Sequence, residues 1–136
     1  FINDSKATTF ASTMNILKVL KKVYWLVGGI GKLGDKFTLK KNECKNIKAY
    51  IFGKNKNFFV KKFKNKISYY YFKDLNTAVK QVLKEINNSR DDLHRTVLFS
   101  PAAASFDSFK NFEERGKYFN FLLKKYKVKE IVNATR

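Results

Sequence analysis

Small and hydroxyl-bearing residues are concentrated between Ser100 and Gly116, where the chain reads Ser-Pro-Ala-Ala-Ala-Ser-Phe-Asp-Ser-Phe-Lys-Asn-Phe-Glu-Glu-Arg-Gly. Small residues let a ligand approach the backbone closely, and hydroxyl and N–H groups at a helix start suit an anion. The segment follows a short apolar run, Thr96–Phe99, and leads into apolar residues at helical spacing. Open α/β sheets bind ligands at the carboxyl ends of their strands, so this pattern predicts an anion-binding loop.

A second loop with suitable chemistry is Gly-Gly-Ile-Gly-Lys at Gly28–Lys32, directly after the apolar run Val23–Val27. Glycines let the backbone turn tightly around an anion, and Lys32 would supply the opposite charge. The spacing is not that of a Walker A loop, because Leu33 stands where that motif has Ser or Thr. The residue types alone fit a plain turn equally well.

Asn3–Thr8 contains a third polar group, Asp-Ser-Lys, which residue types alone indicate to be an ordinary loop. No metal site is expected. The single cysteine, Cys44, excludes a cysteine cluster, and the single histidine, His94, excludes a histidine pair.

The elements that must position these loops alternate between strand and helix along the chain. Asp74 is expected to cap the clearest amphipathic helix, with its apolar face at Leu75, Ala78, Val79, Val82, Leu83 and Ile86. Alternation of this kind predicts an α/β fold with a mostly parallel sheet flanked by helices on both faces. The other expected elements are a helix from Thr9 to about Lys21, short helices at Phe37–Lys41 and Asn57–Phe63, and strands at Ile47–Gly53 and Ile67–Tyr71.

The charge is strongly positive, with 29 Lys and Arg against 11 Asp and Glu and a net charge of +18. A basic nucleic-acid-binding module would explain this charge, and the Phe and Lys residues of Phe58–Lys64 would suit stacking on single strands. We favour a solvated lysine surface, because the lysines are spread from Lys6 to Lys129 and the phenylalanines have the helical spacing of core residues. Specific nucleic-acid binding is therefore not expected.

No apolar run approaches the roughly 20 residues of a membrane span, and no signal peptide is evident. We therefore expect no membrane partner, and a cytoplasmic location fits the single cysteine.

All three loops resemble one known family. Ser100–Gly116 closely resembles the C-terminal signature of the MurD family of peptidoglycan ligases, which join D-glutamate to UDP-N-acetylmuramoyl-L-alanine. Asn3–Thr8 and Gly28–Lys32 resemble two further motifs of that family. The chain departs from the family at Ala103, where Cys is usual, at Thr9, where Asn is usual, and at Ile30, where Asp is common.

The resemblance implies that residues 1–136 form a Rossmann-like C-terminal domain, with the N-terminal UDP-binding domain and the central ATPase domain missing from this chain. Family members use ATP and Mg²⁺, held mainly by the central domain, to make an acyl phosphate that the amine of D-glutamate attacks. We therefore expect no catalytic residue in this fragment and no activity from it alone. A stand-alone domain that binds an acidic metabolite is a further alternative.

The resemblance also implies roles for individual residues. The family positions that hold the carboxylates of D-glutamate correspond to Thr8, Lys32, Ser105 and the backbone around Phe112. Two residues are expected near the nucleotide, Asp4 on its ribose side and Lys6 on its phosphate side. Those expected to hold the loop and helix in place are Asp107, Lys110 and Arg115.

Overall fold

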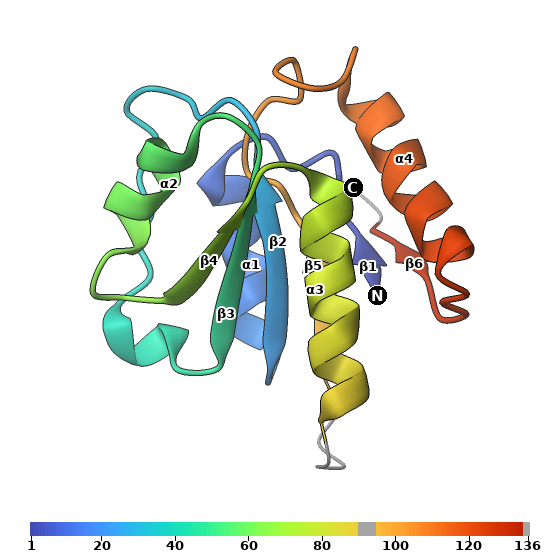
Figure 1. Cartoon of the computed structure of the whole chain (residues 1–136). Helices are drawn as coiled ribbons and strands as arrows, with labels where there is room; N and C mark the ends of the chain where they lie inside the picture. The colour runs from blue at the N-terminus through green and yellow to red at the C-terminus, as the bar shows by residue number, and fades with distance from the viewer. Residues whose placement is uncertain (90–94, 135–136) are drawn as a thin grey trace.

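The computed structural model describes residues 1–89 and 95–134, and His94 lies outside these residues. Six strands form one sheet in the order β4-β3-β2-β5-β1-β6, and every strand pair is parallel (Figure 1). The expected α/β, Rossmann-like arrangement is confirmed. The elements are β1 (Ile2–Asn3), α1 (Phe10–Val19), β2 (Val23–Gly28), the 3-10 helix η1 (Lys41–Cys44), β3 (Ile47–Phe52), α2 (Lys56–Phe63), β4 (Ser68–Phe72), α3 (Leu75–Asn88), β5 (Thr96–Phe99), α4 (Phe112–Lys125) and β6 (Val132–Asn133).

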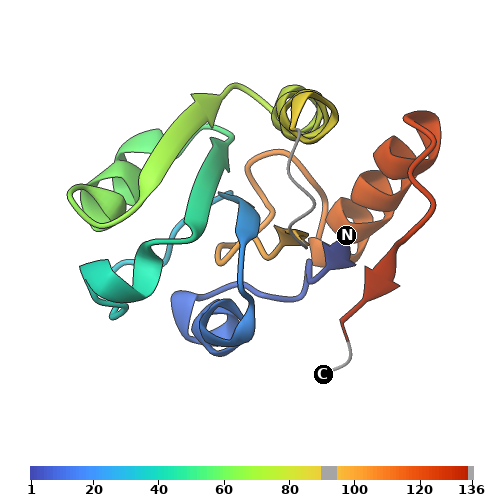
Figure 2. The same ribbon diagram turned by 90° about the horizontal axis from the view of Figure 1, so that it is seen from below.

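The central strands are buried on both faces, so successive side chains enter two separate cores. On β2, Trp25 packs with α1 and α2, whereas Leu26 packs with α3 and α4. Figure 2 looks along the strands and shows α1 and α3 on opposite sides of the sheet. This double coverage explains why the apolar run at Val23–Val27 shows no alternation with polar residues.

The N-terminus of α3 is capped as expected. The Asp74 carboxylate accepts hydrogen bonds from the Thr77 backbone N–H at 2.8 Å and from the Thr77 hydroxyl at 2.7 Å. These hydrogen bonds lower the pKa of Asp74, because they favour the charged form.

Replacing Asp74 with alanine is expected to reduce the free energy of unfolding by about 1 kcal/mol, as is usual for loss of a helix cap. The contribution of the lowered pKa should be present above the unfolded pKa, near 3.8, and should be lost as the pH falls through the lower folded value. Urea unfolding of both proteins at pH 7 and at pH 2.5 measures this. Asp74→Asn, which retains a capping oxygen, is the control. If the difference in free energy of unfolding between the unaltered chain and Asp74→Ala is the same at both pH values, the charge of Asp74 does not contribute.

One sequence-based expectation differs from the structure, and one strand was not anticipated. Residues 37–41 do not form a helix, since the side chains of Phe37 and Leu39 are buried while those of Thr38 and Lys40 are exposed. That period of two belongs to extended backbone, and the helical turn begins only at η1. The short strand β6 was not expected, because both of its residues are exposed and carry no apolar pattern.

Among the described residues, no helix is both long and apolar enough to cross a membrane.

Candidate functional site

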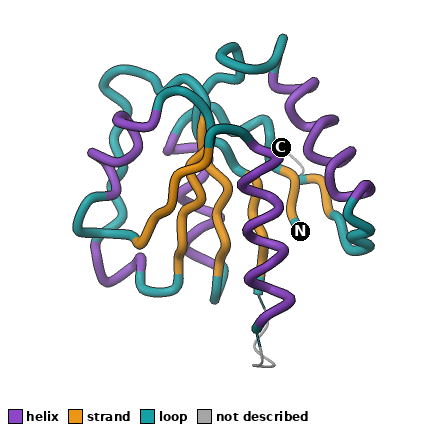
Figure 3. The backbone as a smooth tube through the Cα atoms, viewed as in Figure 1, coloured by secondary structure: helices purple, strands orange, loops and turns teal. Residues whose placement is uncertain are grey.

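The loops that follow β1, β2 and β5 meet at one edge of the sheet, at the top of Figure 1. Figure 3 shows this edge as an almost continuous layer of loops above the strands. The parallel order accounts for the arrangement, because the carboxyl ends of parallel strands lie at the same edge. The three motif segments are therefore neighbours in space, although about 100 residues separate the first from the last.

Backbone hydrogen bonds join the second and third loops. Ile30 and Ala104 form an antiparallel bridge, in which each N–H donates to the other carbonyl at 2.8 and 2.9 Å. The Gly28 N–H donates to the carbonyl of Pro101 at 3.1 Å. Gly29 has a φ of +126°, and a Cβ there would lie 2.3 Å from the carbonyl oxygen of Ala104. Only glycine fits this position, so Gly29 permits the close contact of this loop with the third loop.

Arg115, in the first turn of α4, joins the first and third loops. Its side chain is fully buried, and its guanidinium donates three hydrogen bonds: to the Ser5 hydroxyl at 3.1 Å, to the Ser5 carbonyl at 2.8 Å and to the Ala103 carbonyl at 2.8 Å. Burial lowers the pKa of Arg115 to about 10, while the nearby Asp107 charge acts in the opposite direction. The group therefore keeps its charge at neutral pH and holds the two loops together.

A second buried network lies where β1 and β5 end. The Ser100 hydroxyl donates to the Asp4 carboxylate at 2.8 Å and lies 2.5 Å from the hydroxyl of Thr13. The Trp25 indole donates to the Ser100 carbonyl at 2.7 Å. Asp4 is only 1% exposed, so in this conformation its buried carboxylate links the first loop to the third through the hydrogen bond with Ser100.

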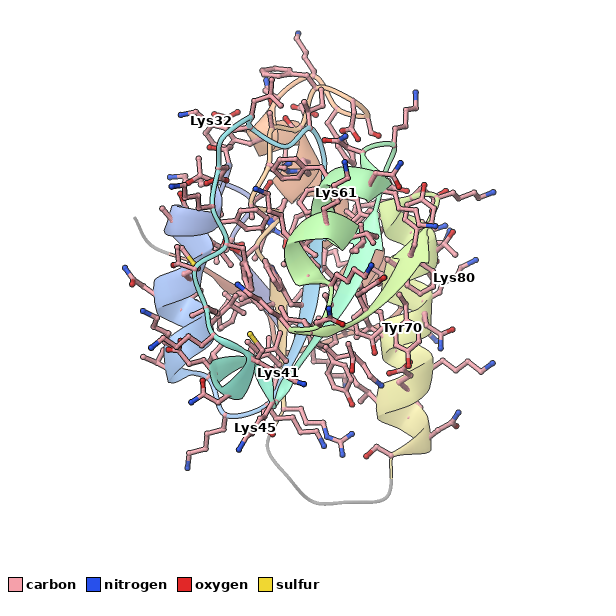
Figure 4. The ribbon with its side chains drawn as sticks, turned by 90° about the vertical axis from the view of Figure 1, so that its left-hand side faces the viewer. Lys32, Lys41, Lys45, Lys61, Tyr70 and Lys80 are labelled. Carbon is pink, nitrogen blue, oxygen red and sulfur yellow. The ribbon has the colours of Figure 1, made fainter. Side chains whose placement is uncertain are left out.

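The positions expected to hold the ligand differ in accessibility. Lys32 is exposed, and Figure 4 places it at the upper edge of the molecule. Thr8 is half-buried, whereas Ser105 is buried and its carbonyl accepts from the Phe109 N–H at 2.8 Å. Phe112 is the first residue of α4.

The N-terminus of α4 is well defined. The Asn111 side chain caps the helix by accepting from the Glu114 N–H at 2.8 Å, and the Phe112 carbonyl accepts from the Ser5 hydroxyl at 2.7 Å. A helix start directs backbone N–H groups outward and favours negative charge. The edge therefore carries an exposed lysine, hydroxyl-bearing loops and a helix N-terminus, features that each suit a carboxylate or a phosphate, while the exposed Glu113 and Glu114 add negative charge in the first turn of α4.

Two further residues shape the site and were not expected from the sequence. The Asn55 side-chain oxygen accepts from the Gly31 N–H at 2.9 Å, and the Asp35 carboxylate accepts from the Phe10 N–H at 2.8 Å. Asp107, expected only to hold the loop, has one carboxylate oxygen that is buried without a hydrogen-bond partner among the described residues. Nothing in the local sequence marks Asn55 or Asp35, because each bonds to a residue more than 20 positions away.

Within the described part of the chain, no three His, Cys, Asp or Glu residues are grouped so that they could hold a metal ion.

Comparison with known proteins identifies the relatives of this chain. No protein-family model matches it. It is 37% identical over 126 residues to the UDP-N-acetylmuramoylalanine--D-glutamate ligase of Rickettsia felis, a match that covers 93% of this chain. The ligases of the same name from Hydrogenobaculum sp. and Prochlorococcus marinus are 38% and 40% identical and cover 91% and 94% of it. The chain belongs to the MurD ligase family.

These matches cover 28%, 29% and 28% of the three relatives, so the chain spans less than a third of the length of the MurD ligases that it matches. The three loops that resemble MurD motifs in sequence are those that the structure brings to one edge.

Proposed function

We propose that this chain is the C-terminal domain of an ATP-dependent ligase that adds D-glutamate to UDP-N-acetylmuramoyl-L-alanine during peptidoglycan synthesis. The N-terminal UDP-binding domain and the central ATPase domain would belong to the remainder of the protein. The similarity to proteins of that name over about nine-tenths of this chain supports the proposal. The observation that carries it is the meeting of all three motif loops at one edge of the sheet.

The role of this domain is to hold D-glutamate while its amine faces the activated acyl carbon. Its two carboxylates require a cation and several hydrogen-bond donors. Lys32 would provide the charge, and Thr8, Ser105 and the backbone around Phe112 would provide the donors. The hydrogen bonds of Arg115 to the Ser5 and Ala103 carbonyls hold the backbones of the first and third loops together. Fixing the amine in this way lowers the entropic part of the barrier.

On the nucleotide side, ATP and Mg²⁺ would be bound mainly by the central domain. Lys6 is exposed and is assigned to the phosphate side. Asp4 is assigned to the ribose side, and its contact with a ribose requires its buried carboxylate to become exposed when the domains close. An ATP-dependent reaction on a UDP-linked precursor belongs in the cytoplasm, where we place the enzyme.

Enzyme assays test this proposal directly. The full-length ligase should release phosphate and form product when given UDP-N-acetylmuramoyl-L-alanine, ATP, Mg²⁺ and D-glutamate, and it should fail with L-glutamate as the matched control. The isolated 136-residue chain should show no turnover, because it carries no ATP-binding P-loop motif. Robust turnover by the isolated chain, or a full-length enzyme indifferent to D-glutamate, would refute the proposal.

A further inference from the structure

The strand β4 forms an open edge of the sheet. It pairs with β3 through residues 48–52 and 68–72 in unbroken one-to-one register, and it has no second strand partner in the described part of the chain. Natural edge strands are usually protected by a lysine, a proline or a bulge on the strand itself. β4 reads Ser-Tyr-Tyr-Tyr-Phe and has none of these. Its outer backbone N–H and C=O groups are therefore available for another strand.

Two of the three tyrosines of β4 are exposed, and both contact neighbouring residues. Tyr70 is 46% exposed and Tyr71 is 39% exposed. The ammonium of Lys48 lies 5.3 Å from the centre of the Tyr70 ring, and that of Lys56 lies 5.1 Å from the centre of the Tyr71 ring. The Tyr71 hydroxyl donates to the Gly53 carbonyl at 2.6 Å. These contacts place a lysine ammonium over each of the two rings. The outer backbone of β4 is the part of the strand that still lacks a strand partner among the described residues.

The segment of the chain that contains β4 carries half of the net charge, and one of its lysines, Lys48, is paired with Glu85 of α3 at 3.4 Å. Residues 44–73 contain nine lysines and no Asp or Glu, against a net charge of +18 for the whole chain. Figure 4 looks onto this side of the molecule and shows Lys61 of α2, Tyr70 of β4 and Lys80 of α3 on the same face. The nine lysines are Lys45, Lys48, Lys54, Lys56, Lys61, Lys62, Lys64, Lys66 and Lys73.

We propose that the β4 edge binds an extended acidic peptide, which adds to the sheet as a further strand. Its backbone would pair with the outer side of β4, and its carboxylates would face the lysines of α2 and the adjoining loops. A second copy of this chain would bring the same positive charge to the edge and be repelled. Single-stranded nucleic acid would need free ring faces for stacking, and Lys48 and Lys56 lie over those rings.

A charge test uses a labelled peptide of alternating Glu and Val, about 12 residues long, with binding followed by fluorescence anisotropy. The variant Lys61→Gln/Lys64→Gln/Lys73→Gln removes three exposed lysines next to β4 and should weaken binding about tenfold. The matched control Lys117→Gln/Lys124→Gln/Lys125→Gln removes the same charge from α4, which packs against β1 beyond the centre of the sheet. It should change the affinity less than about twofold. Equal losses from the two variants would overturn the proposal, because binding would then follow net charge alone.

A backbone test keeps the peptide's charge and removes its ability to pair. The same peptide N-methylated at alternate residues should bind the unaltered chain at least about tenfold more weakly, since a strand addition depends on backbone hydrogen bonds. Equal binding of the two peptides would overturn the proposal. So would tighter binding of a 12-nucleotide oligo-dT that is lost in Tyr70→Ala, which would assign the face to nucleic acid. Because this test uses the unaltered chain, it holds even if the lysine variants fold poorly.

Discussion

Replacing Arg115 with methionine is expected to lower the free energy of unfolding by about 3 kcal/mol or more. The guanidinium is completely buried and donates to three acceptors on Ser5 and Ala103. Methionine is of similar length but offers no donor, so these acceptors and the neighbouring Asp107 carboxylate would be left without compensation inside the protein. Removing the hydrogen-bond partner of a buried polar group lowers the free energy of unfolding far more than removing the partner of an exposed group.

Urea unfolding of the chain measures this loss. Lys117→Met is the matched control, because Lys117 lies two residues further along α4 with 76% of its side chain exposed. It should change stability by no more than about 0.5 kcal/mol. Arg115→Lys should fall in between, since it restores the charge but cannot reach three acceptors in a fixed plane. If Arg115→Met is as stable as the control, the guanidinium does not hold the loops together.

Lys32→Ala in the full-length ligase is expected to weaken the use of D-glutamate by about 10- to 150-fold. This range follows from the roughly 1.5–3 kcal/mol of a hydrogen bond to a charged group and about 1.4 kcal/mol per factor of ten. Lys32 is exposed at the edge where the three loops meet, so its replacement should leave the fold intact. Ser105→Ala should cost less, because neighbouring N–H donors remain.

Steady-state kinetics with each substrate varied in turn will separate the possible outcomes. The KM for UDP-N-acetylmuramoyl-L-alanine should change little, since another domain would hold that substrate. Lys36→Ala is the matched control, because it removes an exposed lysine from the same connection and should leave D-glutamate use unchanged. Unaltered KM and kcat for D-glutamate in Lys32→Ala, or damage confined to the nucleotide-sugar substrate, would show that Lys32 is not in the glutamate site.

Local sequence patterns determined most of the secondary structure. The apolar run of β2 predicted a strand covered on both faces, and the spacing from Leu75 to Ile86 predicted the helix that Asp74 caps. Parallel strands place their carboxyl ends at one edge, so the meeting of the three loops also followed from the sequence. These features depend on periodicity and on caps within a few residues, which a single sequence displays directly.

Only the tertiary structure decided how the loops are held together. Arg115 in Glu-Glu-Arg-Gly has the local pattern of an exposed helix residue, yet it is buried against Ser5, which is 110 positions away. The same holds for the bridge between Ile30 and Ala104 and for the bond from Gly31 to Asn55. Such contacts leave no mark in local periodicity, because each depends on which loops the folded sheet brings together. The open edge at β4 likewise appears only once the strand order is known, since no strand reveals from its own residues that it lacks a neighbour.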